Sequence, residues 1–83
     1  MALIIPATVV KQMKAMPKAD QDRIIDALGQ VAENLAVRMP FVTEMAGEPG
    51  AWRLRKGDWR ATFVIDGENV VVTRVGNRRE IDR

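Results

Sequence analysis

Two stretches in which apolar and polar residues alternate flank the dipeptide Gly57-Asp58, and this arrangement constrains the fold more than any other feature of the sequence. A glycine-containing dipeptide between two such stretches predicts a β-hairpin with a two-residue loop. That loop sets the cross-strand pairs Lys56–Trp59, Arg55–Arg60, Leu54–Ala61, Arg53–Thr62 and Trp52–Phe63. Because like charges directly opposite each other destabilise a sheet, the Arg55–Arg60 pair indicates an anion between them, with a phosphate as the obvious candidate.

The two faces of this hairpin differ in character, because side chains alternate between the faces of a sheet. One face is apolar and consists of Trp52, Leu54, Trp59, Ala61, Phe63 and Ile65. The other consists of Arg53, Arg55, Arg60 and Thr62. We assign Trp52 and Trp59 to core packing rather than to base stacking, because they belong to the apolar face. Two interpretations of the arginine face remain open, a solvated sheet surface and a surface that binds a polyanion.

A third strand, extending to Arg79, is expected after a second turn at residues 66–68. A three-residue loop there places Arg74 opposite Arg60, on the basic face. A two- or four-residue loop instead places Arg74 opposite Ala61, on the core side. We favour the three-residue loop, because a charge on the core face needs a buried partner.

The N-terminal half shows helical periodicity after a short apolar stretch. Residues 2–5, closed by Pro6, are expected to form an edge or terminal strand. A first helix is expected over residues 8–16, ended by Pro17, and a second follows with Asp20 as its N-cap. The second helix carries an apolar stripe formed by Ile24, Leu28, Val31 and Leu35, and its opposite face carries Asp22, Asp26, Gln30 and Glu33.

These elements predict the fold class. Residues 36–50 are expected to be mostly loop, with a short strand at residues 41–45. Residues 1–83 are expected to form a single domain of the α+β class. In that fold an N-terminal helical hairpin packs on one face of a twisted, mainly antiparallel sheet, and the opposite face is left open.

Composition restricts the chemistry that is available. The chain contains no His, Cys, Ser or Tyr, which excludes Ser-His and Cys-His nucleophilic sites and the usual zinc sites, and we expect no metal and no cofactor. Residues 1–50 carry five basic and six acidic residues, whereas residues 51–83 carry eight basic and five acidic ones. Seven of those eight are arginine, which binds phosphate in a bidentate manner, so this part of the chain predicts one surface that faces a polyanion. No apolar run approaches a membrane span and no signal peptide is visible, so a cytoplasmic location is expected.

The C-terminal pattern resembles a known family. A helical hairpin followed by W-R-L-R-x-G-D-W-R-x-x-F-x-I-D and then by V-V-V-x-R-V-G-x-R-R-E-I is similar to the RelE/ParE superfamily of bacterial type II toxins, over about residues 6–82. The resemblance implies a small cytoplasmic toxin that is held inactive by a cognate antitoxin. RelE-like members look like metal-independent endoribonucleases that cleave mRNA in the ribosomal A site. ParE-like members share the fold but poison DNA gyrase.

The resemblance also implies roles for individual residues. The basic residues of the RelE type match Arg53, Arg55, Arg60 and Arg78, which become the catalytic candidates. Two departures from many relatives are Asn77, in place of a His, and Asp82, in place of a Tyr that often serves catalysis. The proton-transfer step is therefore left without its usual carrier.

Further candidates come from the residues near the expected cleft. We choose Glu80 as the general base, with a salt bridge to Arg78 or Arg79 as its alternative role. Arg74, Arg79 and Lys56 are candidates for nucleic-acid binding.

The leading hypothesis is a type II toxin that inhibits translation by ribosome-dependent mRNA cleavage through the arginine face. The alternatives are a ParE-like gyrase inhibitor without catalytic activity and a decayed toxin that only binds its antitoxin. The expected partners are the antitoxin, together with the ribosome and mRNA or with gyrase. An amphipathic, partly acidic antitoxin segment is expected to cover either the arginine face or the helical hairpin.

Overall fold

The computed structural model of the protein describes residues 2–34, 39–45, 47–48 and 50–81. Leu35, which was predicted to belong to the apolar stripe, lies outside this range. So does Asp82, which stands where many relatives have a Tyr. In chain order the elements are β1 (Leu3–Ile4), α1 (Ala7–Lys14), α2 (Lys18–Glu33), β2 (Val42–Glu44), β3 (Ala51–Lys56), β4 (Trp59–Asp66), β5 (Asn69–Asn77) and α3 (Arg78–Ile81).

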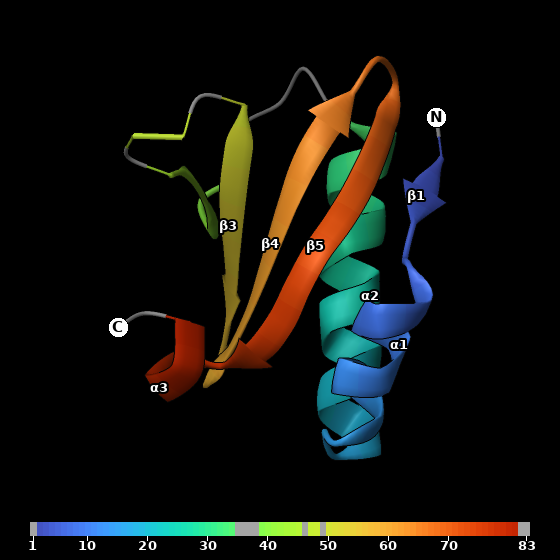
Figure 1. The fold of residues 1–83 in the computed structure, drawn as a ribbon, viewed down its shortest axis with the longest axis vertical. Helices are drawn as coiled ribbons and strands as arrows, with labels where there is room; N and C mark the ends of the chain where they lie inside the picture. Colours follow the sequence, from blue (N-terminus) through green and yellow to red (C-terminus); the bar gives the residue numbers. More distant parts are fainter. Residues whose placement is uncertain (1, 35–38, 46, 49, 82–83) are drawn as a thin grey trace.

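The strands form one sheet of order β1-β5-β4-β3-β2, in which β1 pairs parallel to β5 and every other pair is antiparallel. Helices α1 and α2 lie together on one side of the sheet (Figure 1). The predicted α+β class, with a helical hairpin on one face of a mainly antiparallel sheet, is confirmed. We call the sheet face turned away from α1 and α2 the outer face.

The core lies between the helical hairpin and the sheet. On α2 the described residues of the predicted stripe, Ile24, Leu28 and Val31, are buried, and Ile24 and Leu28 have no exposed surface. Leu54 and Phe63 supply the facing surface of the sheet, and both are also buried. The two tryptophans are half-buried and pack against this core, which confirms their assignment to packing. Ile65, expected on the same apolar face, is instead 39% exposed, next to the β4–β5 turn.

The start of α2 differs from its prediction. Pro17, and not Asp20, occupies the N-cap position, and the helix begins at Lys18. Asp20 lies inside the first turn, where a carboxylate is stabilised by the positive end of the helix dipole. Helix α1 ends at Lys14, two residues before the predicted end, although Met16 is still buried.

The first hairpin has the predicted register, with all five pairs from Lys56–Trp59 to Trp52–Phe63 in place. Gly57 has a φ of 59°, in the left-handed region that a type II′ turn requires at its first loop position. Glycine has no Cβ and reaches this region without steric cost, which explains its place at this position.

The second hairpin corrects the prediction. Its loop is the two-residue Gly67-Glu68, because Asp66 pairs with Asn69, so the three-residue loop and the Arg74–Arg60 pair are wrong. A β-bulge in β5 lies opposite the step from Thr62 to Phe63 in β4. It leaves Thr73 without a cross-strand partner and shifts the register by one residue. Arg74 therefore faces Thr62 and still lies on the outer face.

The bulge is consistent with the apolar spacing of β5. Val70, Val72 and Val75 are all buried, and their spacing switches from two to three residues where the extra residue is inserted. The hydroxyl oxygens of Thr62 and Thr73 lie 2.7 Å apart in a hydrogen bond that spans the irregular position.

The C-terminal end was expected to continue as a strand to Arg79, but β5 ends at Asn77 and the short helix α3 follows. Gly76 permits this turn, because a Cβ there would lie 3.2 Å from Glu80 Oε2 and 3.4 Å from Ile81. Gly76 pairs with Arg60, so its missing Cβ points to the outer face. Helix α3 therefore packs on the outer face, near the β3–β4 turn (Figure 1).

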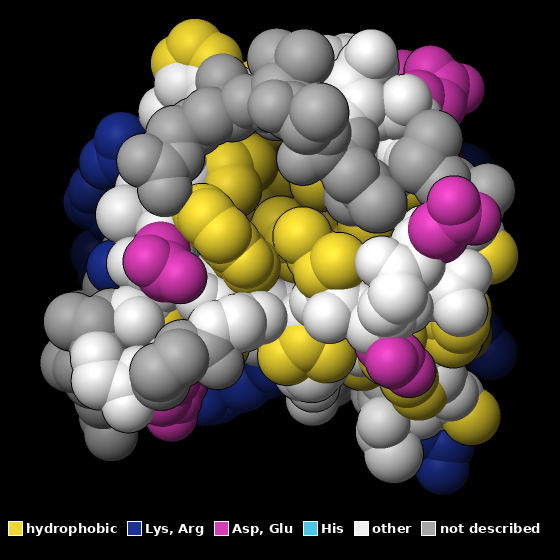
Figure 2. All heavy atoms as spheres, turned by 90° about the horizontal axis from the view of Figure 1, so that it is seen from above, with side chains coloured by type: hydrophobic (Ala, Val, Ile, Leu, Met, Phe, Trp, Pro, Cys, Tyr) yellow, Lys and Arg dark blue, Asp and Glu magenta, His cyan; other side chains and the backbone are white. Residues whose placement is uncertain are grey.

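Figure 2 shows the end of the molecule that lies uppermost in Figure 1. Hydrophobic side chains line a hollow there, and acidic side chains stand around its rim.

Within the described residues, no helix is long and apolar enough to cross a membrane.

Candidate nucleic-acid interface

The outer face carries its polar side chains in two rows that run across β3, β4 and β5. One row is Arg53–Thr62–Arg74, and the other is Arg55–Arg60–Gly76. The rows are two residues apart along each strand, so about 7 Å separates them. Four predicted site arginines thus share one sheet face.

Arg60 is the most constrained of these arginines. Its exposed fraction is 8%, and its Nη1 donates hydrogen bonds to the carbonyl oxygens of Gly57 (2.8 Å) and Trp59 (2.9 Å). These bonds direct the guanidinium back over the β3–β4 turn and fix its orientation. Arg55, its cross-strand partner, is exposed. The predicted like-charge pair is therefore present, with one fixed and one solvated member.

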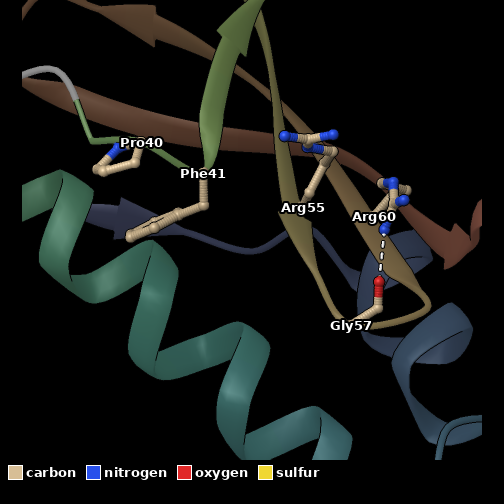
Figure 3. A pocket seen from close by; sticks show the side chains of 5 residues that line it. All are labelled: Pro40, Phe41, Arg55, Gly57 and Arg60. Atoms are coloured by element: carbon tan, nitrogen blue, oxygen red, sulfur yellow. Dashed lines mark hydrogen bonds between the residues drawn. The ribbon is translucent and has the colours of Figure 1, made fainter.

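A pocket of about 340 Å³ lies beside this pair, and we call it the arginine pocket. It is lined by Pro40, Phe41, Arg55, Gly57 and Arg60. Figure 3 shows Pro40 and Phe41 on one side of it and the two arginines on the other. None of the described residues that line it is acidic, so the pocket carries two positive charges and suits an anion.

A second pocket, the C-terminal pocket, has a volume of about 350 Å³. It is lined by Asp58, Asn77, Arg78, Arg79 and Glu80. Because Gly57 lines the first pocket and Asp58 the second, the β3–β4 turn stands between them. This pocket combines two arginines with two carboxylates and is therefore mixed in charge.

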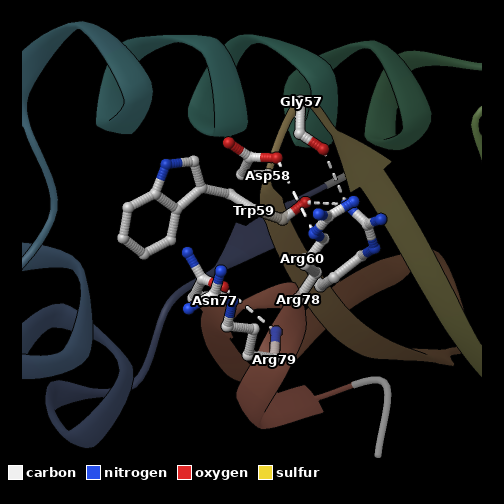
Figure 4. A network of polar contacts seen from close by, with 7 residues as sticks. All are labelled: Gly57, Asp58, Trp59, Arg60, Asn77, Arg78 and Arg79. Carbon is white, nitrogen blue, oxygen red and sulfur yellow. Dashed lines mark hydrogen bonds and ion pairs between the residues drawn. The ribbon is translucent and has the colours of Figure 1, made fainter.

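Polar contacts attach α3 to the β3–β4 turn (Figure 4). The backbone N–H of Arg78 donates to the Asp58 carbonyl at 2.8 Å, and Arg78 Nε lies 3.8 Å from Asp58 Oδ1. The Arg79 N–H donates to Asn77 Oδ1 at 3.0 Å, so Asn77 caps the first residues of α3. The exposed ion pair contributes little to stability, and the backbone bond is the more important attachment.

The structure brings the predicted residues together in three groups. Arg55 and Arg60 share the arginine pocket, and Arg78, Arg79 and Glu80 share the C-terminal pocket. Arg53 and Arg74 occupy the neighbouring row, and Arg74 Nη2 also donates to the Glu80 carbonyl at 3.5 Å. Lys56 belongs to neither pocket, and its Nζ lies 5.5 Å from the centre of the Phe41 ring.

Five residues of these pockets were not predicted as site residues, namely Pro40, Phe41, Gly57, Asp58 and Asn77. The available signal for Phe41 was its place at the start of the short predicted strand, because a strand there is able to pair with β3. Phe41 O indeed accepts a hydrogen bond from the Arg55 N–H at 2.9 Å. Among the described residues, no group of three or more His, Cys, Asp or Glu is placed to hold a metal ion.

The fold is similar to those of chains in solved toxin–antitoxin structures. A chain of the RelB–RelE antitoxin–toxin complex from Methanococcus jannaschii matches with a TM-score of 0.79 and 20% identity, covering 95% of this chain and 94% of that one. A chain of the RelE–RelB complex from Pyrococcus horikoshii matches with a TM-score of 0.76 and 22% identity, covering 93% of each. The isolated RelE toxin of E. coli matches with a TM-score of 0.75 and 16% identity, covering 90% of this chain and 81% of RelE. At these identities the likeness concerns the fold alone.

The family itself is shown by sequence. The family model described as the ParE toxin of the type II toxin–antitoxin system parDE matches residues 3–82, and no curated protein matches significantly. The chain belongs to this toxin family, within the RelE/ParE superfamily, and the resemblance is confirmed.

Proposed function

We propose that this toxin inhibits translation by binding and cleaving mRNA on the ribosome, with the arginine pocket holding the scissile phosphate. The observation that supports this proposal most is the cross-strand pair Arg55–Arg60 in an open pocket without an acidic lining residue among those described. Such a pair carries two adjacent guanidinium groups, which match the nonbridging oxygens of a phosphodiester.

The proposed reaction is attack of a ribose 2′-hydroxyl on the adjacent phosphorus. The 2′-oxygen forms a bond to phosphorus, the bond from phosphorus to the 5′-oxygen breaks, and a cyclic phosphate and a 5′-hydroxyl result. Charge accumulates on the nonbridging oxygens in the transition state, and stabilising that charge is usually the largest catalytic contribution. Arg60 suits this role because its orientation is already fixed before the substrate binds.

The proton of the 2′-hydroxyl needs an acceptor, and we assign this role to Glu80. Its carboxylate lies over Gly76, the cross-strand neighbour of Arg60, which supports this assignment. Glu80 then returns the proton to the departing 5′-oxygen. Arg53 and Arg78, on either side of the Arg55–Arg60 row, are proposed to contact the same phosphate region, and Arg74, Arg79 and Lys56 the neighbouring backbone.

The test is induction of the toxin in cells without its antitoxin, while methionine and thymidine incorporation are followed together. We expect methionine incorporation to fall first, and Arg55→Ala to abolish that fall. Arg23→Ala is the matched control, because Arg23 is an exposed arginine of α2 that lines neither pocket, and it should remain toxic. A fully toxic, folded Arg55→Ala variant contradicts the proposal.

A second candidate is inhibition of DNA gyrase without catalysis. It is favoured by the matched family model, which is that of a ParE toxin, and by the lack of His, Tyr, Ser and Cys in the chain. In that case thymidine incorporation falls first, and the purified protein blocks supercoiling by gyrase. If the protein changes neither methionine nor thymidine incorporation, it is a decayed toxin that retains only antitoxin binding.

The proposed partner in each case is a cognate antitoxin, as in the RelB–RelE complexes that share the fold. The arginine pocket favours an acidic antitoxin segment, because its described lining is positively charged. Such a segment competes directly with the phosphate of the RNA. Co-expression with an acidic antitoxin should therefore protect cells, and the purified complex should not bind RNA.

A further inference from the structure

Phe41 forms part of the arginine pocket but has no role in the proposed cleavage reaction. Its position relative to the arginines is set by the backbone, because the Arg55 N–H donates to the Phe41 carbonyl at 2.9 Å. Phe41 also lies within a turn closed by the hydrogen bond from the Val42 N–H to the Met39 carbonyl at 3.1 Å. The Phe41 ring and the Arg55 guanidinium thus belong to two residues whose backbones are joined by a hydrogen bond.

Phe41 is not fully buried. Phe41 is half-buried, and part of it packs against the core, while another part contributes to the pocket wall. Lys56 Nζ lies 5.5 Å from the ring centre, and Arg55 lies across the pocket from it. An aromatic side chain and arginines that line one pocket are the combination with which proteins bind single-stranded nucleic acid, since bases stack on the ring and the cations hold the backbone.

We propose that the arginine pocket is a subsite for one nucleotide, in which the base stacks on Phe41 while Arg55 and Arg60 hold its phosphate. This inference rests on the proposed function, because it takes RNA as the ligand of the pocket. The pocket volume of about 340 Å³ is at the lower end of the range for ligand pockets, which suits one nucleotide rather than a folded RNA element. Stacking is tolerant of sequence, so the subsite positions the RNA without requiring one particular base.

A comparison of two ligands of equal charge tests the subsite. One ligand is a single-stranded RNA tetranucleotide, and the other is the same ribose-phosphate backbone without bases. The wild-type chain is expected to bind the RNA about tenfold more tightly than the abasic backbone, because stacking on one aromatic ring contributes about that factor. Fluorescence anisotropy of end-labelled ligands measures both affinities.

Three variants separate the two halves of the subsite. Phe41→Leu keeps an apolar side chain against the core but removes the aromatic surface, so it should lose the preference for RNA and bind both ligands as the wild type binds the abasic one. Phe41→Trp offers a larger ring and should retain the preference, which also controls for a folding defect in the leucine variant. Arg55→Ala should weaken both ligands by a similar factor.

The outcomes distinguish this inference from the proposed function. Equal binding of the RNA and the abasic backbone by the wild type, or an undiminished preference in folded Phe41→Leu, overturns the stacking subsite alone. Cleavage of mRNA is then still tested by the incorporation experiment, which does not depend on a base contact. Unchanged binding of both ligands by Arg55→Ala overturns the phosphate half of the subsite and argues against the mechanism proposed for the arginine pocket.

Discussion

Arg55 and Arg60 face each other on adjacent strands, but different contacts surround them. Arg60 is nearly buried and donates two hydrogen bonds to backbone carbonyls of the β3–β4 turn, whereas Arg55 is exposed. Arg60 therefore has a structural role in addition to its proposed contact with the phosphate, whereas the proposed contact is the role assigned to Arg55. Replacing Arg60 removes its turn contacts together with its proposed contact to the phosphate, so a loss of toxicity in that variant has two explanations. A loss of toxicity on replacing Arg55 is explained by the phosphate contact.

This difference predicts the stability of two matched variants. Arg60→Ala removes both hydrogen bonds of a charged donor and should lower the free energy of unfolding by about 2–3 kcal/mol. Arg55→Ala removes an exposed side chain and should change it by no more than about 0.5 kcal/mol. Urea denaturation followed by tryptophan fluorescence measures both. Equal losses in the two variants would show that the turn contacts of Arg60 do not stabilise the fold.

At the scale of single elements, helix α2 shows how the helical period decides burial. Ile24 is fully buried against the sheet, while its neighbour Ile25 is 41% exposed. The two residues are chemically identical and adjacent, so they form a matched pair on one helix.

Ile24→Ala should lower the free energy of unfolding by about 2–5 kcal/mol, because it removes buried methyl groups and leaves a cavity. Ile25→Ala should cost less than about 1 kcal/mol, because its side chain is largely solvated and alanine has the higher helix propensity. Thermal unfolding measured by circular dichroism compares them. A larger loss for Ile25 would mean that α2 presents a different face to the sheet.

The bulge in β5 is a second feature of this scale. It inserts Thr73 between the part of the strand that follows the two-residue turn and the part that carries Arg74. A regular strand after that turn would place Arg74 on the core side, opposite Ala61. One extra residue thus keeps a charged side chain out of the core.

Two single-residue deletions in β5 test this interpretation. Deleting Thr73 removes the extra residue and leaves Arg74 on the outer face, so the fold should persist at a cost of about 1–3 kcal/mol for the unpaired Thr62 hydroxyl. Deleting Val71 in the regular part removes the same length of backbone, but it moves Thr73 to the core side opposite Phe63. The melting temperature should therefore be lower for the Val71 deletion, and the reverse order would contradict the assigned bulge.

At the scale of the whole molecule, charge is segregated by region. The C-terminal part, which forms β3, β4, β5 and α3, carries eight basic and five acidic residues, while the first 50 residues carry five and six. The sheet gathers part of this excess on its outer face, so the electrostatic contribution to ligand binding should come from one side of the molecule.

Salt dependence provides the corresponding measurement. RNA binding should weaken as salt rises, because each neutralised phosphate of a single strand contributes a slope of about −0.7 in log affinity against log salt. Arg55→Ala should reduce the magnitude of that slope by about 0.7, whereas Arg23→Ala should leave it unchanged. Equal slopes for the wild type and Arg55→Ala would place the phosphate contacts elsewhere.

The features that were predictable from the sequence are those with a local cause. The Gly57-Asp58 loop sets the register of the first hairpin because a two-residue turn aligns its strands directly, and the α2 stripe follows from the helical period. The segregation of charge and the arginine face follow from the same alternation. The RelE/ParE resemblance relied on these same local patterns.

Only the tertiary structure decided the rest, because the contacts concerned join residues far apart in the chain. The parallel pairing of β1 with β5 joins the two ends of the chain, with Leu3 opposite Val70. The bulge depends on how β5 fits both its turn and the core. Helix α3 replaces the expected strand end because Gly76 leaves room for Glu80. Phe41 reaches the arginines through the pairing of β2 with β3, and the short strand predicted at residues 41–45 did not by itself specify its partner strand.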